Sequence, residues 1–279
     1  MASRPPRWRL RLLSLASSAA VALTAIAAWA PPAHAAGVVY TALGDSYASG
    51  VGTRTYYSDG TSCYRAPYAY PALDASRIGA TTFAFAACSG ARVSDVLNKQ
   101  LGSLSAATTY VTVTVGGNDA GFSQVISQCA LPWPYTCWGN IDNANSYIKN
   151  TLPGTLDKLY DRIRALAPGA RVLVVGYPRL FNESDCQSIA RISPGEQASL
   201  NDTADLLATT LQARAVAHGF VFVDPRTAFT GHAVCDAVEW INGPSYPTME
   251  SYHPNRTGQD TGYAALVKNA MLSTSTAAA

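Results

Sequence analysis

Short apolar segments alternate along this chain with longer segments of helical character, and this alternation limits the folds that the chain can adopt. The apolar segments consist almost entirely of apolar, β-branched and aromatic residues: Val38–Leu43, Thr82–Ala86, Tyr110–Val115, Arg171–Gly176 and Phe220–Asp224. Continuous apolar strands are buried on both faces, which is typical of parallel sheets. We therefore expect an α/β fold built on about five mostly parallel strands.

The segments between the expected strands favour helices. Their ranges are about Tyr68–Ile78, Val93–Leu101, Ala144–Ala167, Pro194–Ala217 and Thr257–Leu272. Pro153 should divide or kink the third helix, because proline removes a backbone donor. Residues 50–67, 122–143 and 227–255 are predicted to form long loops, which are often functional in compact domains. Helices on both faces of the sheet would give a three-layer α/β/α sandwich.

The first 35 residues have the pattern of a secretory signal peptide. Four arginines between residues 4 and 11 precede an apolar run over about residues 12–29, and Ala33-His34-Ala35 forms an A-x-A cleavage signal. A membrane anchor is the alternative, but the run is short, rich in alanine and followed by two prolines. We expect a secreted, extracellular protein with one domain over residues 36–279 and no stable membrane anchor.

The arginines of the signal segment also change how the charge is interpreted. The whole chain has a formal net charge of +2, but without these four arginines the remainder carries about −2. A nucleic-acid-binding protein needs a basic face, so nucleic acid is not an expected partner. No later segment is long and apolar enough to span a bilayer, and we expect a monomer with at most transient contact with a lipid interface.

The chain contains an even number of cysteines, all after the signal segment: Cys63, Cys88, Cys129, Cys137, Cys186 and Cys235. In an exported protein this predicts three disulfides, although sequence alone does not choose the pairing. Locally, a Cys129–Cys137 bond would close a short loop rich in proline and tryptophan. A zinc site is the alternative, but the chain has no C-x-x-C motif and no histidine at ligand spacing. The cysteines are therefore expected to form disulfides instead of a zinc site. We expect no metal and no other cofactor.

Polar and glycine-containing motifs follow the first three expected strands. They are GDSY at 44–47, ACSGA at 87–91 and GGND at 116–119, and a fourth motif, SYHPN at 251–255, precedes the last expected helix. The carboxyl ends of parallel strands meet at one edge of a sheet, where sites form. We therefore expect these four motifs to lie close together.

The residues in these motifs suit acyl transfer. A serine hydroxyl is a weak nucleophile until a base takes its proton, which makes Ser46 the candidate nucleophile and His253 the candidate base. The backbone N–H groups of Ser46 and Gly90 and the side-chain amide of Asn118 are candidate donors to an oxyanion. Singly, these signals are weak, because such a serine can be a helix N-cap and such a histidine a loop residue. Their joint occurrence in this order favours a serine hydrolase.

The four motifs together resemble those of the SGNH (GDSL-type) hydrolases, whose signature residues are Ser, Gly, Asn and His. The chain is also similar to the secreted bacterial lipases and phospholipases A1 of that group, which carry the GDSY-x-SG-x-G opening, ACSGAR and GGNDAGF. This resemblance spans nearly all of residues 36–279. It implies a flavodoxin-like fold, the site residues Ser46, Gly90, Asn118 and His253, and the disulfides Cys63–Cys88, Cys129–Cys137 and Cys186–Cys235.

One position departs from the family pattern. Many members place an aspartate three residues before the histidine, where it orients the imidazole, and here that position is Glu250. Glu250 is therefore a candidate catalytic residue through its side chain. Alternatively, a backbone carbonyl of Glu250 or Ser251 takes that role, as the resemblance to acid-lacking lipases implies. Either group would fix the Nδ1–H tautomer and leave Nε2 facing Ser46.

The long loops carry many aromatic residues, some of which could line an acyl groove while others pack beneath the loops. We expect a lipase, esterase or phospholipase A1 that acts on small-molecule or lipid esters. One alternative is a carbohydrate O-acetyl esterase of the same family, and another, from a different class, is a non-catalytic secreted binding domain. An α/β-hydrolase is less favoured, because no G-x-S-x-G motif occurs in the chain.

Overall fold

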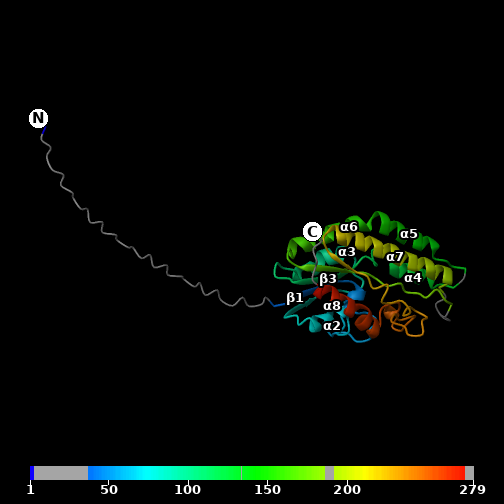
Figure 1. Cartoon of the computed structure of the whole chain (residues 1–279). Helices are drawn as coiled ribbons and strands as arrows, with labels where there is room; N and C mark the ends of the chain where they lie inside the picture. Colours follow the sequence, from blue (N-terminus) through cyan, green and yellow to red (C-terminus); the bar gives the residue numbers. More distant parts are fainter. Residues whose placement is uncertain (3–36, 133, 186–191, 274–279) are drawn as a thin grey trace. The chain divides into compact units, whose positions relative to one another are not determined.

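The centre of the molecule is a five-stranded parallel sheet (Figure 1). The computed structural model describes residues 1–2, 37–132, 134–185 and 192–273. Within them, the strands pair in the order β2-β1-β3-β4-β5. Their bounds are β1 Val39–Gly44, β2 Thr82–Phe85, β3 Tyr110–Thr114, β4 Arg171–Val175 and β5 Val221–Val223. This is the flavodoxin-like order, so the predicted fold class is confirmed.

The central strand β3 is buried on both faces, as its sequence pattern predicts. Val111 and Val113 fill one face, while Thr112 and Thr114 point to the other and are fully buried. Buried hydroxyl groups need partners. Tyr40 of β1 and Tyr70 of the facing helix supply them, with phenol-to-threonine distances of 2.8 Å in both cases. At β3, the sheet thus packs through valines on one face and through tyrosine–threonine pairs on the other.

Helices cover both faces of the sheet (Figure 1). The helices α3, α4, α5, α6 and α7 lie on one side, and α2 and α8 lie on the other. Their bounds are α2 Tyr70–Arg77, α3 Val93–Asp95, α4 Phe122–Cys129, α5 Trp138–Asn150, α6 Leu152–Leu166, α7 Pro194–Ala217 and α8 Ala265–Leu272. The segments η1 Val96–Gln100 and η4 Gly258–Ala264 are π-helical. The segments η2 Leu101–Ser103 and η3 Thr248–Glu250 are 3₁₀-helical.

The helices differ from the predictions mainly where they are short. The one-turn helix α1 (Ser46–Ser49) and α4 fall in segments that were not predicted to be helical, and α5 begins at Trp138 instead of about residue 144. Four to eight residues offer too few turns for a periodic pattern to stand out. The expected break at Pro153 is present: α5 ends at Asn150, and α6 carries this proline in its first turn.

The sheet topology creates a crevice at the carboxyl ends of β1 and β3. After β1 the chain crosses to β2 on one side, and β3 then pairs with β1 on its other side. Connections that leave neighbouring strands in opposite directions open a space between their loops, and ligands bind there in open α/β sheets. The GDSY and GGND motifs occupy these two loops.

Two disulfides fix the long loops. Cys63–Cys88 ties the loop after α1 to the turn that follows β2, and Cys129–Cys137 closes the connection between α4 and α5. The third expected pair involves Cys186, which lies outside the described residues, as do residues 3–35 of the expected signal peptide. Residues from Gly37 onward form one compact unit. None of the described helices has both the length and the apolar character required to cross a bilayer.

Asp74 of α2 is a buried carboxyl group in this scaffold. Its side chain is fully buried, and among the described residues neither of its oxygens has a hydrogen-bond partner. Burial raises the pKa of Asp74 from its ordinary value of 3.8 to about 8, although Arg77 and Lys268 act in the opposite direction. The folded protein therefore retains a proton that the unfolded chain releases near pH 4, so this group reduces stability as the pH rises from about 4 to about 8.

Asp74→Asn should remove this loss of stability. We expect the variant to gain free energy of unfolding relative to the parent between pH 5 and pH 8, with a limiting slope of about 1.4 kcal/mol per pH unit. Urea denaturation at a series of pH values measures this difference. Asp142→Asn, at an exposed position of α5, is the control for loss of one carboxylate. A difference between Asp74→Asn and the parent that does not grow with pH would contradict the assignment.

Candidate active site

Ser46 is held at the carboxyl end of β1 by a tight turn. Asp45 N-caps the one-turn helix α1: its side chain accepts the N–H of Tyr47 at 3.0 Å, and its own N–H donates to the carbonyl of Thr114 at 2.9 Å. Gly44 has φ +135°, and a Cβ there would lie 2.4 Å from the Thr114 carbonyl oxygen. Only glycine fits so close to the neighbouring strand. Ser46 therefore follows the strand directly, as the first residue of α1.

His253 reaches Ser46 from the segment before η4. Its Nε2 lies 2.8 Å from the Ser46 Oγ, and its Nδ1 lies 2.9 Å from the carbonyl oxygen of Ser251. Because a carbonyl can only accept, Nδ1 carries the hydrogen, and the lone pair of Nε2 faces the serine hydroxyl. Tyr47, the residue after the serine, donates its phenol hydrogen to the carbonyl of Tyr252 at 2.7 Å and so anchors the histidine segment.

Removal from water lowers the pKa of His253 from 6.5 to about 4, although the Ser251 carbonyl opposes this shift. The imidazole is therefore unprotonated at neutral pH and able to accept a proton. When it becomes positively charged, its partner at Nδ1 is the carbonyl dipole of Ser251.

The Glu250 side chain is directed elsewhere. One carboxylate oxygen accepts the phenol hydrogen of Tyr56 at 2.6 Å, and the other lies 3.4 Å from the guanidinium of Arg54. The sequence left open whether this side chain or a carbonyl orients His253. The geometry favours the Ser251 carbonyl, and Glu250, a candidate catalytic residue from sequence, instead joins the histidine segment to the loop after α1.

The two further candidate donors lie on adjoining loops. Asn118 follows β3, and its side-chain amide donates to the carbonyl of Ala91 at 3.0 Å, which uses one of its two hydrogens. Gly90 immediately precedes Ala91, has φ +78° and is exposed. The N–H of Cys88 donates to the carbonyl of Gly44 at 2.9 Å, so the ACSGA loop is joined to both the serine loop and the asparagine loop.

A mostly apolar cavity of about 480 Å³ opens beside this group. Ser46, Asn118 and His253 lie in its wall, whereas Gly90 is not among its lining residues. The remaining wall comes from α4, α5, α7 and the segments after β4 and β5, including Ile126, Ile148, Leu180, Ala204, Leu207 and Met249. The cavity therefore offers an apolar surface directly next to a serine hydroxyl.

Residues 42–261 match the model of the GDSL-like lipase/acylhydrolase family. The chain belongs to this family. It is 43% identical over 262 residues to Lipase 1 of Streptomyces coelicolor, which covers 94% of this chain and 96% of that protein. The family resemblance found in the sequence is thus confirmed.

Two solved structures are similar over most of the chain. They are the extracellular lipase of Streptomyces rimosus and phospholipase A1 of Streptomyces albidoflavus NA297, each with a TM-score of 0.80 and 42% identity. Each match covers 84% of this chain, and it covers 100% of the lipase and 99% of the phospholipase.

Sequence reasoning missed Tyr177 in this GDSL-family site. Its hydroxyl lies 2.5 Å from the Asp45 carboxylate and accepts the N–H of Gly117 at 3.3 Å. Burial raises the pKa of Asp45 to about 7, and the hydrogen bond from Tyr177 opposes this shift. The available signal was position: Tyr177 comes two residues after β4, at the same sheet edge as the motifs after β1 and β3.

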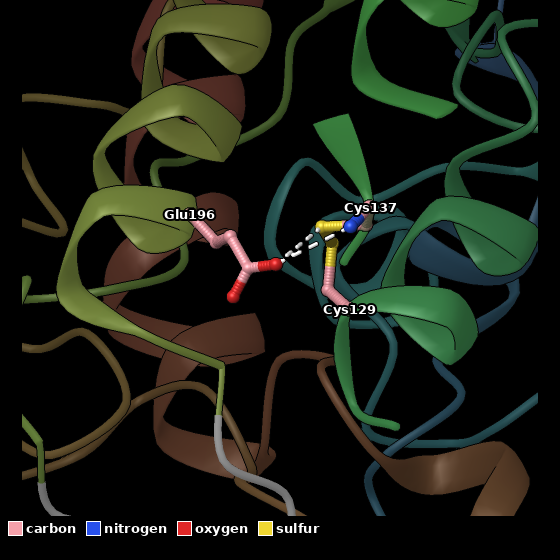
Figure 2. A group of neighbouring side chains, drawn as sticks. All are labelled: Cys129, Cys137 and Glu196. Atoms are coloured by element: carbon pink, nitrogen blue, oxygen red, sulfur yellow. Dashed lines mark hydrogen bonds between the residues drawn. A yellow bond between two sulfur atoms is a disulfide. The ribbon is translucent and has the colours of Figure 1, made fainter. Parts of the chain in front are cut away.

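Among the described residues, one group of ligand-type side chains lies outside this site (Figure 2). Cys129, Cys137 and Glu196 approach within 4.8 Å of one another, but both sulfurs are used in a disulfide. Glu196 has two local partners: it forms a capping box with Ser193 at the start of α7, and it accepts the N–H of Cys137 at 3.3 Å. A structural role therefore accounts for this group without a metal.

Glu250→Gln should leave turnover close to that of the parent, within about threefold, because the variant keeps an oxygen for Tyr56 and does not alter the Ser251 carbonyl. Steady-state hydrolysis of a soluble p-nitrophenyl ester measures it. If Glu250 were the acid of a triad, loss of its charge would reduce kcat by about four orders of magnitude, as removal of a triad carboxylate does. Such a loss, with an unchanged melting temperature, would contradict the assignment to the carbonyl.

Proposed function

We propose that this chain is an exported carboxylic ester hydrolase that cleaves fatty-acyl esters, with Ser46 as nucleophile and His253 as general base. The observation that carries the proposal is the 2.8 Å contact between Ser46 Oγ and His253 Nε2 beside an apolar cavity. A hydroxyl bonded to the unprotonated nitrogen of an oriented imidazole is the arrangement that activates a serine.

In the proposed acylation step, Ser46 Oγ attacks the ester carbonyl while Nε2 of His253 takes its proton. The carbonyl of Ser251 holds Nδ1–H and stabilises the imidazolium that forms. Collapse of the tetrahedral intermediate transfers the proton from Nε2 to the leaving alcohol. In deacylation, His253 takes a proton from water, the resulting hydroxide attacks the acyl-serine, and the proton returns to Ser46 as the acid leaves.

The negative charge of the tetrahedral intermediate needs donors that are already in place. The backbone N–H groups of Ser46 and Gly90 and the second amide hydrogen of Asn118 are proposed for this role, each worth about 3 kcal/mol of transition-state stabilisation. The hydrogen bond from Asn118 to Ala91 supports it, because it fixes the amide and leaves one N–H for the substrate.

The cavity favours a long acyl chain over an acetyl group. A volume of about 480 Å³ with a mostly apolar wall suits hydrocarbon, whereas an acetyl group would leave most of that surface in contact with water. The relatives named lipase and phospholipase A1 support the same choice. A carbohydrate O-acetyl esterase is therefore the less favoured alternative. A non-catalytic binding domain would have no use for a hydroxyl paired with a base.

Export is supported by three observations. The sequence begins with a segment that has the features of a signal peptide, two disulfides join the loops, and one similar structure is of an extracellular lipase. Disulfides persist in oxidising compartments, which fits an extracellular enzyme.

Ser46→Ala and His253→Ala should each reduce kcat by about four orders of magnitude or more, because either change removes the activated nucleophile. Hydrolysis of p-nitrophenyl esters measures this, and melting temperatures show whether the variants stay folded. His232→Ala is the matched control, and its loss should leave kcat unchanged. This histidine lies in a loop outside the site and stacks on Trp240, with ring centroids 3.7 Å apart. A folded Ser46→Ala protein with the activity of the parent would overturn the proposal.

Ala204→Phe should shift the preference from long to short acyl esters. Ala204 lies in the cavity wall on α7, so an added ring would occupy space that the proposal assigns to the acyl chain. We expect the ratio of kcat/KM for octanoate to that for acetate to fall by at least about tenfold. Ala213→Phe, on the exposed side of α7, is the control. Equal losses for all chain lengths would contradict the assignment of the cavity to the acyl chain.

A further inference from the structure

We infer that Tyr177 is a positioning residue for the proposed reaction, because its hydroxyl joins the loop that carries the nucleophile to the loop that carries the oxyanion donor. This inference rests on the proposed roles of Ser46 and Asn118. Tyr177 itself lies outside the four motifs in which the family's signature residues occur, in the segment that follows β4.

The phenol bridges the immediate neighbours of two proposed catalytic groups. Asp45 precedes Ser46, and Gly117 precedes Asn118. The N–H of Gly117 can only donate, so it donates to the Tyr177 oxygen at 3.3 Å. The phenol hydrogen is then directed to the Asp45 carboxylate, at 2.5 Å. One hydroxyl thus sets the separation of the two loops through a single chain of hydrogen bonds.

Close packing restricts this bridge to one geometry. Tyr177 is 8% exposed and Asp45 is 2% exposed. The ring of Tyr177 contacts Tyr47 edge-to-face, with centroids 5.1 Å apart. A Cβ at Gly117 would lie 3.4 Å from the Cζ atom of Tyr177, so the backbone at Gly117 packs directly against the tyrosine ring. The tyrosine therefore supports the Gly117–Asn118 backbone by contact as well as by its hydrogen bond.

The Asp45 side chain makes the bridge sensitive to loss of the hydroxyl. Its carboxylate accepts two hydrogen bonds, from the phenol of Tyr177 and from the N–H of Tyr47. Because burial already raises the pKa of Asp45 to about 7, an oxygen that loses the phenol donor takes up a proton or turns toward another donor. Since Asp45 also caps the helix that begins with Ser46, reorganisation there would displace the nucleophile.

Tyr177→Phe tests this inference because it removes one oxygen and keeps the ring. We expect kcat for a soluble p-nitrophenyl ester to fall by about 10- to 100-fold, with KM within about threefold of the parent, since misplacement of reacting groups mainly lowers kcat. Tyr177 also lines the cavity, and a role in binding the acyl chain would raise KM instead. Tyr160→Phe is the matched control, because this buried phenol has no hydrogen-bond partner among the described residues. Its kcat should equal that of the parent.

A double-mutant cycle with Asp45→Asn separates positioning from a general effect on stability. If both residues act through one hydrogen bond, the double variant should lose little more kcat than the worse single variant, whereas independent structural effects would multiply. Asp45→Asn also carries the test on its own if Tyr177→Phe is unstable at the assay temperature. It can keep an oxygen for Tyr47 N–H, while an amide nitrogen, which only donates, replaces the carboxylate oxygen that accepts the phenol hydrogen of Tyr177.

The outcomes distinguish this inference from the proposed function. Parent-like kcat in folded Tyr177→Phe, with Ser46→Ala inactive, would overturn the inference and leave the function standing. Multiplicative losses in the cycle would also overturn it. Parent-like activity of Ser46→Ala would overturn the proposed function instead.

Discussion

The hydrogen bond between Ser46 and His253 is the interaction on which the candidate active site depends. It joins residues 207 positions apart in the sequence. The two ends are set by separate constraints: the β1–β3 pairing and Gly44 position the serine, while the phenol of Tyr47 and the Ser251 carbonyl position the histidine. Tyr47 belongs to the GDSY motif, and its phenol binds the carbonyl of Tyr252 next to His253. This one residue therefore fixes the histidine segment relative to Ser46.

The use of a carbonyl in place of a carboxylate at Nδ1 has an electrostatic consequence. A partial charge stabilises an imidazolium less than a full negative charge does, and removal from water lowers the pKa of His253 to about 4. The imidazole is therefore uncharged at neutral pH and is intrinsically a weak proton acceptor. Under the proposed function, preorganised donors to the oxyanion have to supply more of the stabilisation of the transition state. The links among the Gly44, Ala91 and Asn118 loops are consistent with that demand.

Much of the architecture could be predicted because the relevant signals are local. Continuous apolar runs located the ends of all five described strands to within one residue, since strands buried on both faces have little freedom in composition. The short helix α4 was missed, because two turns provide little periodicity. The motifs after β1 and β3 were expected to meet at one sheet edge, and that follows from the parallel topology alone.

The parts that could not be predicted depend on where long side chains point. Glu250 has a sequence position suited to a triad acid, but Tyr56 and Arg54 bind its carboxylate from a loop almost 200 residues earlier in the chain. Tyr177 follows a strand as the motifs do, yet a lone tyrosine carries no catalytic signature. Only the folded arrangement brings its hydroxyl between Asp45 and Gly117.

Reaction with a fluorophosphonate tests the central claim most directly, because such a reagent traps an activated serine. The purified protein would be labelled, digested and analysed by mass spectrometry, and the labelling rate compared with that of a variant lacking the imidazole of His253. We predict one adduct per chain, on Ser46, formed at a rate that depends on His253. An adduct on another residue, or labelling of Ser46 that is equally fast without the imidazole, would contradict it.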